Sequence, residues 1–216
     1  MAGLPSIAPY PMPTAAQLPA NRVGWTPAPD RAVLLIHDMQ NYFLGAFAAD
    51  QEPLVELESN ILMLRACATG LGMPVVYTAQ PGGQTQRERG LQLDMWGAGI
   101  GADPDEAAVP ASLAPREQDI QLTKWRYNAF HRTELCEVFD RTGRDQLVVC
   151  GIYAHLGCLM TAADAFMRDI QAFFVADAVA DFSRADHEMA VRYAANRCAV
   201  TTTTERLVAA LTGGGA

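Results

Sequence analysis

Short runs of apolar and β-branched residues recur along this chain, and each is about as long as one β-strand. Longer segments with the apolar periodicity of helices separate these runs. The short runs predict six strands, at residues 32–38, 73–80, 119–125, 146–153, 171–178 and 198–204. The longer segments predict helices at residues 52–72, 131–143, 157–169 and 183–197.

Several of the predicted strands are apolar without a break, as in "AVLLIHD" and "QLVVCGIY", rather than on alternate residues. Continuous apolar strands joined by helices are typical of a parallel sheet that is covered on both faces. The pattern therefore predicts an α/β fold, a three-layer αβα sandwich around a six-stranded, mainly parallel, doubly wound sheet. A chain of 216 residues, half of them hydrophobic, is long enough for one such domain.

Residues 1–31 hold seven of the 13 prolines and show no helical periodicity. This composition indicates an N-terminal arm laid over the domain, which then spans residues 32–212. Because such arms often pack on a partner subunit, we expect a homo-oligomer, and a dimer in particular.

The charge pattern limits the classes of partner. The formal net charge is −8, and the 16 lysines and arginines are scattered rather than grouped into a stripe that could neutralise phosphates. The N-terminus lacks the basic and apolar regions of a signal peptide, and no run approaches 18 apolar residues. We expect a cytoplasmic protein that binds neither nucleic acid nor membranes.

No cofactor or metal is expected either. The five cysteines are widely spaced without a CxxC pair, and the four histidines show no HxH, HxxxH or HExxH spacing. The glycine-rich "GAGIG" at 97–101 follows no predicted strand, so it indicates a loop rather than a dinucleotide site.

Two charged residues and a glycine stand where three predicted strands end. Asp38 closes the first strand, Lys124 lies at the end of the third, and Gly157 opens the helix after the fourth. Ligands of open parallel sheets bind at the carboxyl ends of strands, near the point where strand order reverses. A buried Asp and Lys are costly unless they pair closely or serve a function. The three residues are candidate catalytic residues, and a purely structural Asp38–Lys124 ion pair is the alternative.

Several blocks of sequence occur together in a characteristic order. They are "RAVLLIHDMQNYF" at 31–43, "VVYTAQPG" at 75–82, "DMWGAG" at 94–99, "LTKWRYNAFHRT" at 122–133, "GRDQLVVCGIYAHLGC" at 143–158 and "DAFMRDIQAFFVADAVADFS" at 164–183. Through these blocks the chain resembles the isochorismatase-like hydrolases, a superfamily that also contains nicotinamidases. Within it, the chain resembles most the isochorismatases of catechol siderophore (2,3-dihydroxybenzoate) pathways, and it is similar to the aminodeoxyisochorismate hydrolases of phenazine pathways.

The resemblance assigns roles to the three candidates. Amidohydrolases of the superfamily use an Asp, a Lys and a nucleophilic Cys, and their nucleophile position corresponds to Gly157 here, with Cys158 one residue later and turned away. An enzyme without this thiol forms no covalent intermediate. The implied substrate is isochorismate, whose enolpyruvyl vinyl ether is hydrolysed to pyruvate and 2,3-dihydro-2,3-dihydroxybenzoate. Asp38 would be the general acid, and Lys124 would meet a substrate carboxylate or orient a hydroxyl.

Other positions match residues that line the substrate pocket of the family. They are Gln80, Arg89, Trp96 and Tyr153, with Phe43 as a further candidate. Arg89 can bind a carboxylate through its planar guanidinium, and Trp96 can pack against the substrate ring and exclude water. The family often has Ser where this chain has Asn128. Some siderophore enzymes continue into an aryl carrier domain, which we do not expect here.

Three alternative functions remain at this point. One is hydrolysis of 2-amino-2-deoxyisochorismate to trans-2,3-dihydro-3-hydroxyanthranilate and pyruvate, which needs the same acid. A second is a noncatalytic docking protein of a synthetase assembly. The third, amidohydrolysis of nicotinamide, is disfavoured because it needs a nucleophile at position 157.

Overall fold

The structure is a computed structural model that describes residues 4–213. Its centre is a single sheet of six parallel strands in the order β3-β2-β1-β4-β5-β6. The strands are β1 (Ala32–His37), β2 (Val75–Ala79), β3 (Ile120–Thr123), β4 (Gln146–Ile152), β5 (Gln171–Ala180) and β6 (Ala199–Thr202). The predicted α/β class and six-stranded parallel sheet are confirmed.

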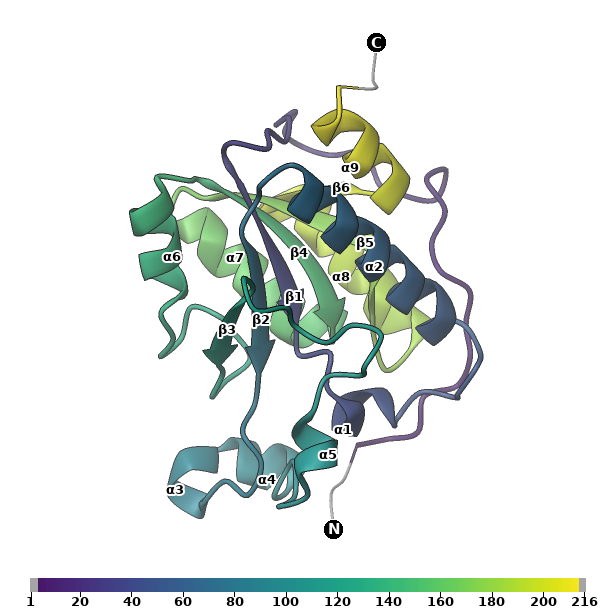
Figure 1. The fold of residues 1–216 in the computed structure, drawn as a ribbon. Coiled ribbons are helices and arrows are strands. Elements are labelled where there is room, and N and C mark those ends of the chain that lie inside the picture. Colours follow the sequence, from purple (N-terminus) through teal and green to yellow (C-terminus); the bar gives the residue numbers. More distant parts are fainter. Residues whose placement is uncertain (1–3, 214–216) are drawn as a thin grey trace.

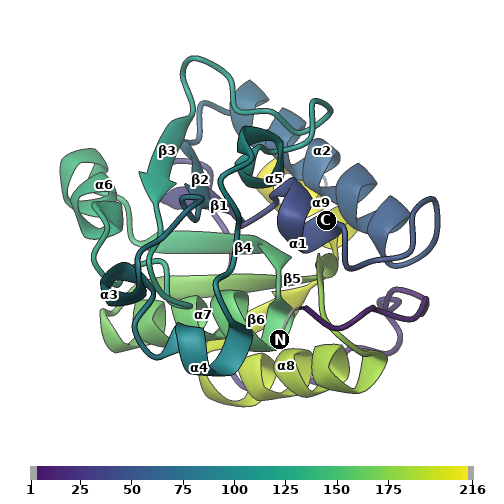
Figure 2. The ribbon, with the colours of Figure 1, turned by 90° about the horizontal axis from the view of Figure 1, so that it is seen from below.

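Helices cover both faces of this sheet (Figures 1 and 2). The four predicted helices correspond to α2 (Leu54–Gly70), α6 (Leu135–Thr142), α7 (Leu159–Met167) and α8 (Arg184–Arg197). The pattern missed α9 (Thr204–Leu211) and the short α1 (Asn41–Leu44), α3 (Gln86–Arg89), α4 (Gln92–Trp96) and α5 (Pro104–Ala107). A helix of four or five residues is too short to show a 3.6-residue period.

Successive side chains of a strand point to opposite faces, so β1 contributes to two cores. Leu34 and Ile36 pack with the buried faces of α2 and α9. Val33 and Leu35 pack with α6, α7 and α8 on the other face. The continuous apolar sequence of β1 follows from burial on both sides, as all six of its residues are buried.

The N-terminal arm packs on its own domain. Ile7 pairs with Phe47 in an isolated parallel bridge, and Ile7, Tyr10 and Met12 belong to the core cluster on the α2 face. The hydroxyl of Tyr10 accepts a hydrogen bond from the backbone N–H of Asp181 at 2.8 Å. These contacts hold the start of the chain beside the carboxyl ends of the strands, where Leu4 reaches the pocket described below.

The strand order reverses between β1 and β4. From β1 the chain adds β2 and β3 on one side, and it then crosses to β4 on the other side. Figure 1 shows α1, α3, α4 and α5 gathered beyond the carboxyl ends of the strands, where they cover this switch point. Ligands of doubly wound sheets bind at this position.

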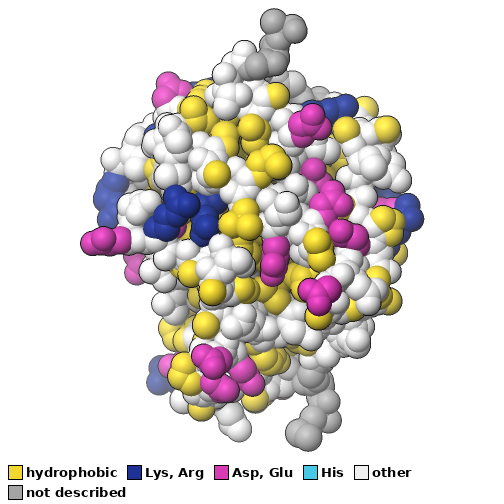
Figure 3. Space-filling model, turned by 45° about the vertical axis from the view of Figure 1, so that its right-hand side comes forward, with side chains coloured by type: hydrophobic (Ala, Val, Ile, Leu, Met, Phe, Trp, Pro, Cys, Tyr) yellow, Lys and Arg dark blue, Asp and Glu magenta, His cyan; other side chains and the backbone are white. Residues whose placement is uncertain are grey.

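On the face of the described chain shown in Figure 3, a few Lys and Arg side chains lie among acidic and apolar ones. Among residues 4–213, no helix has the length and apolar character needed to cross a membrane.

Candidate active site

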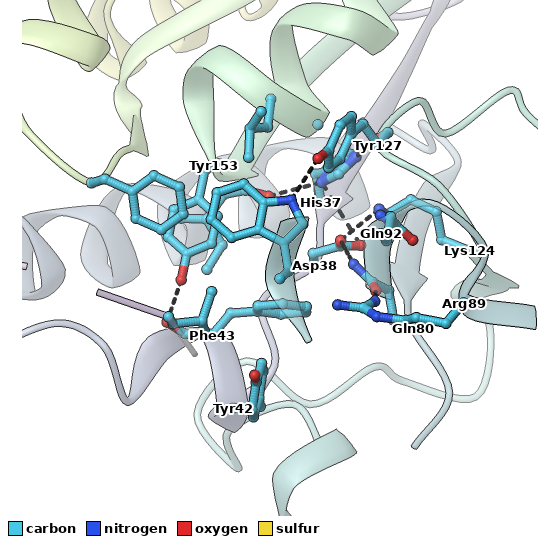
Figure 4. A pocket seen from close by; sticks show the side chains of 16 residues that line it. His37, Asp38, Tyr42, Phe43, Gln80, Arg89, Gln92, Lys124, Tyr127 and Tyr153 are labelled. Atoms are coloured by element: carbon cyan, nitrogen blue, oxygen red, sulfur yellow. Dashed lines mark hydrogen bonds and ion pairs between the residues drawn. The ribbon is translucent and has the colours of Figure 1, made fainter. Parts of the chain in front are cut away.

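A pocket opens at the switch point between β1 and β4, with a free space of about 490 Å³ including its mouth. All eight residues that the sequence indicated line it: Asp38, Phe43, Gln80, Arg89, Trp96, Lys124, Tyr153 and Gly157. Figure 4 shows Gln80 and Lys124 turned toward Asp38, with the Arg89 guanidinium beside Gln80. The structure therefore brings together residues that are spread over about 120 positions of sequence.

Asp38 and Lys124 form a buried ion pair. The Lys124 ammonium lies 2.7 Å from Oδ2 of Asp38, and the two side chains are 1% and 6% exposed. Asp38 directly follows β1 with a φ of 50°, a conformation in which Asp is found more often than most residues. The hydroxyl of Thr78 donates to the other carboxylate oxygen, Oδ1, at 2.8 Å. Lys124 directly follows β3 and also donates to the carbonyl of Arg126 at 2.7 Å.

Opposing effects act on the pKa of Asp38. Burial disfavours the carboxylate and raises the pKa. The charge of Lys124, together with hydrogen bonds from Lys124 and Gln80, lowers it further than burial raises it, so the pKa lies below its ordinary value. This balance favours the carboxylate form of Asp38, and Asp38 becomes a proton donor only if a ligand changes the balance.

Gln80 and Arg89 extend the polar side of the pocket. The Gln80 amide donates to Oδ2 of Asp38 at 3.2 Å, and its oxygen accepts from the Arg89 guanidinium at 3.2 Å. Arg89 also donates to the carbonyl of Gly97 at 3.0 Å, and it is only 5% exposed. No carboxylate pairs with Arg89 among the described residues. A buried guanidinium whose partners are all neutral is suited to an anionic ligand.

Aromatic rings form the opposite wall. Tyr153 packs against Phe182 with ring centroids 4.1 Å apart, and Trp96 stacks on Phe182 at 5.5 Å. Phe43 meets Tyr153 edge to face, and the Tyr153 hydroxyl donates to the carbonyl of Phe43 at 2.8 Å. This wall offers a flat apolar surface for a ring and keeps water from the Asp38–Lys124 pair.

The position of Gly157 needs one correction. We expected Gly157 to open the helix after β4, but a single π-helical turn, η1 (Ala154–Cys158), begins three residues earlier, and α7 follows it. A Cβ at Gly157 would lie 2.0 Å from Cε1 of His37. The His37 ring therefore occupies the space that a side chain at position 157 would need.

His37 is fully buried and spans two segments of the site. Its Nδ1 lies 2.9 Å from the carbonyl of Ile152, and its Nε2 lies 3.2 Å from the carbonyl of Tyr127. Burial lowers the pKa of the imidazole, which favours the neutral ring. A neutral ring has a single N–H, so it donates to only one of the two carbonyls. The ring packs between the end of β4 and the loop after Lys124, and it closes the nucleophile position.

Cys158 lies away from the pocket. Its side chain is fully buried in the core on the α6 face, and burial raises the pKa of its thiol well above the usual value. The sequence interpretation of Cys158 as a packed helix residue agrees with this location.

We therefore expect Cys158→Ala to keep kcat within about threefold of wild type, because the thiol is neither accessible nor ionised. Iodoacetamide should inactivate the protein only slowly, at the same rate with or without ligand. Fast inactivation that a ligand prevents would contradict this placement of the thiol.

Several pocket residues escaped sequence reasoning, among them His37, Tyr42, Gln92, Tyr127 and Phe182. His37 and Tyr42 adjoin predicted residues, and Tyr127 lies three residues after Lys124, so proximity in the sequence could have indicated them. Gln92 and Phe182 carry no such signal. Asn128 does not line the pocket: it donates to Asp164 at 2.6 Å and so ties the Lys124 loop to α7. In residues 4–213, no three His, Cys, Asp or Glu side chains are grouped as a metal site.

Comparison with known proteins adds independent evidence. The family model of the isochorismatase domain matches residues 32–206. The chain is 56% identical over 205 residues to the isochorismatase of Bacillus subtilis. This alignment covers 95% of this chain and 66% of that protein. It is 49% identical over 213 residues to phenazine biosynthesis protein PhzD1 of Pseudomonas aeruginosa, covering 96% of this chain and all of that protein.

A solved structure shares the fold. The crystal structure of a cysteine hydrolase from Pseudomonas syringae pv. phaseolicola superposes with a TM-score of 0.79 at 22% identity, covering 91% of this chain and 99% of that chain. Together with the family match, these similarities confirm the resemblance seen in the motifs. The chain belongs to the isochorismatase family.

Proposed function

We propose that this protein is an isochorismatase, which hydrolyses the vinyl ether of isochorismate to 2,3-dihydro-2,3-dihydroxybenzoate and pyruvate. The observation that carries the proposal is a buried acid–base pair in a pocket without a nucleophile. Asp38 and Lys124 lie 2.7 Å apart, and position 157 is a glycine whose side-chain space is filled by His37. No Ser, Thr or Cys is found among the described residues that line the pocket. This arrangement fits proton transfer rather than covalent catalysis.

Binding of the substrate would convert Asp38 into an acid. Isochorismate carries two carboxylates, one on the ring and one on the enolpyruvyl group. Arg89 and Lys124 are the cations that can meet them in the pocket. Nearby negative charge, and a Lys124 drawn toward the ligand, would both raise the pKa of Asp38. The carboxyl group can then be protonated in the complex, although the surrounding protein groups alone favour its ionised form.

The reaction then needs one proton and one water. Asp38 gives its proton to the terminal methylene carbon, and the ether carbon becomes an oxocarbenium ion. Water adds to this cation, and its released proton returns to the Asp38 carboxylate. The hemiketal collapses to pyruvate, and the ring keeps the original ether oxygen as a hydroxyl. The aromatic wall of Phe43, Trp96 and Tyr153 would hold the ring and limit the entry of other water.

Arg89→Ala should raise KM for isochorismate by about 10-fold to 100-fold, because a buried charge-assisted contact to a carboxylate is lost. kcat should fall less than KM rises. The exposed neighbour Arg87 is a matched control, and Arg87→Ala should leave both constants within about twofold. Equal effects of the two substitutions on KM would show that Arg89 does not bind the substrate.

The second candidate substrate is 2-amino-2-deoxyisochorismate. The 49% identity to a phenazine biosynthesis protein over its whole length favours it. The same acid serves both substrates, since they share the vinyl ether and differ only in a ring hydroxyl or amine. Pyruvate release from each substrate under one condition tests the proposal. Release from isochorismate at the higher kcat/KM supports it. Release from neither would overturn it and favour the docking protein.

A further inference from the structure

Gln92 stands out among the residues that line the pocket. Its side chain is nearly buried, with the residue 6% exposed, and its amide oxygen Oε1 has no hydrogen-bond partner among the described residues. Two other buried side-chain oxygens in residues 4–213 lack a partner, on Thr69 and Gln84, and neither residue lines the pocket. A buried acceptor without a partner costs stability, and in native proteins it calls for an explanation.

The backbone around Gln92 is anchored. Gln92 begins α4, and Trp96 at the other end of this helix donates from its indole N–H to the Tyr127 hydroxyl. Arg89, just before α4, donates to the carbonyl of Gly97 just after it, at 3.0 Å. The short helix is therefore held at both ends over the pocket, and Gln92 lines the pocket together with Asp38 and Lys124 (Figure 4).

A carbonyl oxygen can only accept a hydrogen bond, so its partner must be a donor. With both carboxylates ionised, isochorismate has a single donor, its ring hydroxyl. The amino analogue likewise has a single donor group, its amine, at the same ring position. The carboxylates and the ether oxygen of either molecule are acceptors only, so none of them can donate a hydrogen bond to Oε1 of Gln92.

We propose that Gln92 is a specificity-determining residue whose Oε1 accepts a hydrogen bond from the ring hydroxyl or amine of the substrate. This inference rests on the proposed function, and it places Gln92 against the one group in which the two candidate substrates differ. A neutral acceptor serves a hydroxyl well. A carboxylate at the same place would favour an ammonium group, because charge-assisted hydrogen bonds are the stronger ones.

The test compares wild type with Gln92→Leu and Gln92→Glu, and the readouts are kcat/KM for each of the two substrates and the Tm of the free protein. Gln92→Leu should lower kcat/KM for isochorismate about tenfold, since the buried hydroxyl loses its acceptor. The Tm of that variant should be unchanged or higher, because the unpaired oxygen is gone. Gln92→Glu should raise the ratio of kcat/KM for the amine over that for the hydroxyl by about tenfold or more.

Gln86→Leu is the matched control, because Gln86 lies exposed on α3 and should leave the substrate ratio within about twofold. A ratio unchanged in both Gln92 variants would overturn the inference while leaving the proposed function intact. Equal losses of kcat/KM with both substrates in Gln92→Glu would also overturn the inference, because they would mean that Gln92 only supports α4. If wild type releases pyruvate from neither substrate, the proposed function fails and this inference fails with it.

Discussion

Asp38→Asn should lower kcat at least about 100-fold, because it removes the only carboxyl group that lines the pocket in the described part of the chain. Asparagine keeps the size of the side chain and can still hydrogen-bond Thr78, so the pocket keeps its shape. It cannot give a proton to the substrate. Near-normal kcat in this variant would rule out the acid role of Asp38.

The variant also leaves Lys124 buried without its counter-charge. Loss of one partner of a buried pair costs about 3–5 kcal/mol of stability, so unfolding must be followed beside activity. Asp145→Asn is the matched control, since Asp145 pairs with Arg31 at the exposed surface, with side chains 52% and 42% exposed. Its free energy of unfolding should change by less than about 1 kcal/mol, and its kcat should not change.

Gly157→Ala should destabilise the protein and disturb the site. The added methyl group would lie 2.0 Å from Cε1 and 2.7 Å from Nε2 of His37. The ring is fully buried and lies against the carbonyls of Ile152 and Tyr127, so a shift away from the methyl group would disturb these contacts. We expect a loss of about 1–3 kcal/mol in the free energy of unfolding and a loss of activity, because His37 adjoins Asp38.

Gly70→Ala is its control, as a Cβ at Gly70 would meet nothing within 4 Å. Alanine at this last residue of α2 should be neutral or stabilising by up to about 1 kcal/mol. In a double-mutant cycle, His37→Ala should relieve part of the penalty of Gly157→Ala. Additive effects of the two substitutions, or a Gly157→Ala protein as stable and active as wild type, would show that His37 does not close this position.

Much of the fold could be read from hydrophobic pattern, because β1 and β4 are buried along their whole length and leave unbroken or nearly unbroken apolar runs. Asp38 and Lys124 followed from the same pattern, since parallel strands end at one edge of the sheet. The resemblance to the family identified Gly157 as the nucleophile position, but it gave no indication of what fills the space beside it. Only the folded chain brings His37 against Gly157, across 120 residues of sequence.

The parts that sequence reasoning missed lie beyond the sheet. The helices α3 and α4 are four and five residues long, and they are held by side-chain contacts such as that of Trp96 with Tyr127. Such contacts leave no periodic pattern of apolar residues in the sequence. By pattern alone, Gln92 resembles an ordinary polar residue of a surface loop and Arg89 a solvated charge, although both are buried. The family resemblance indicated Arg89 as a pocket residue, but it did not indicate Gln92.

Hydrolysis in ¹⁸O-labelled water tests the central claim most directly. If Asp38 protonates the methylene carbon, water adds to the enolpyruvyl side and the ring product keeps the ether oxygen. Mass spectrometry of the ring product should then find an unlabelled hydroxyl at that position, which does not exchange readily, unlike the ketone of pyruvate. Label on the ring would show that water attacks the ring carbon, and it would contradict the role assigned to Asp38.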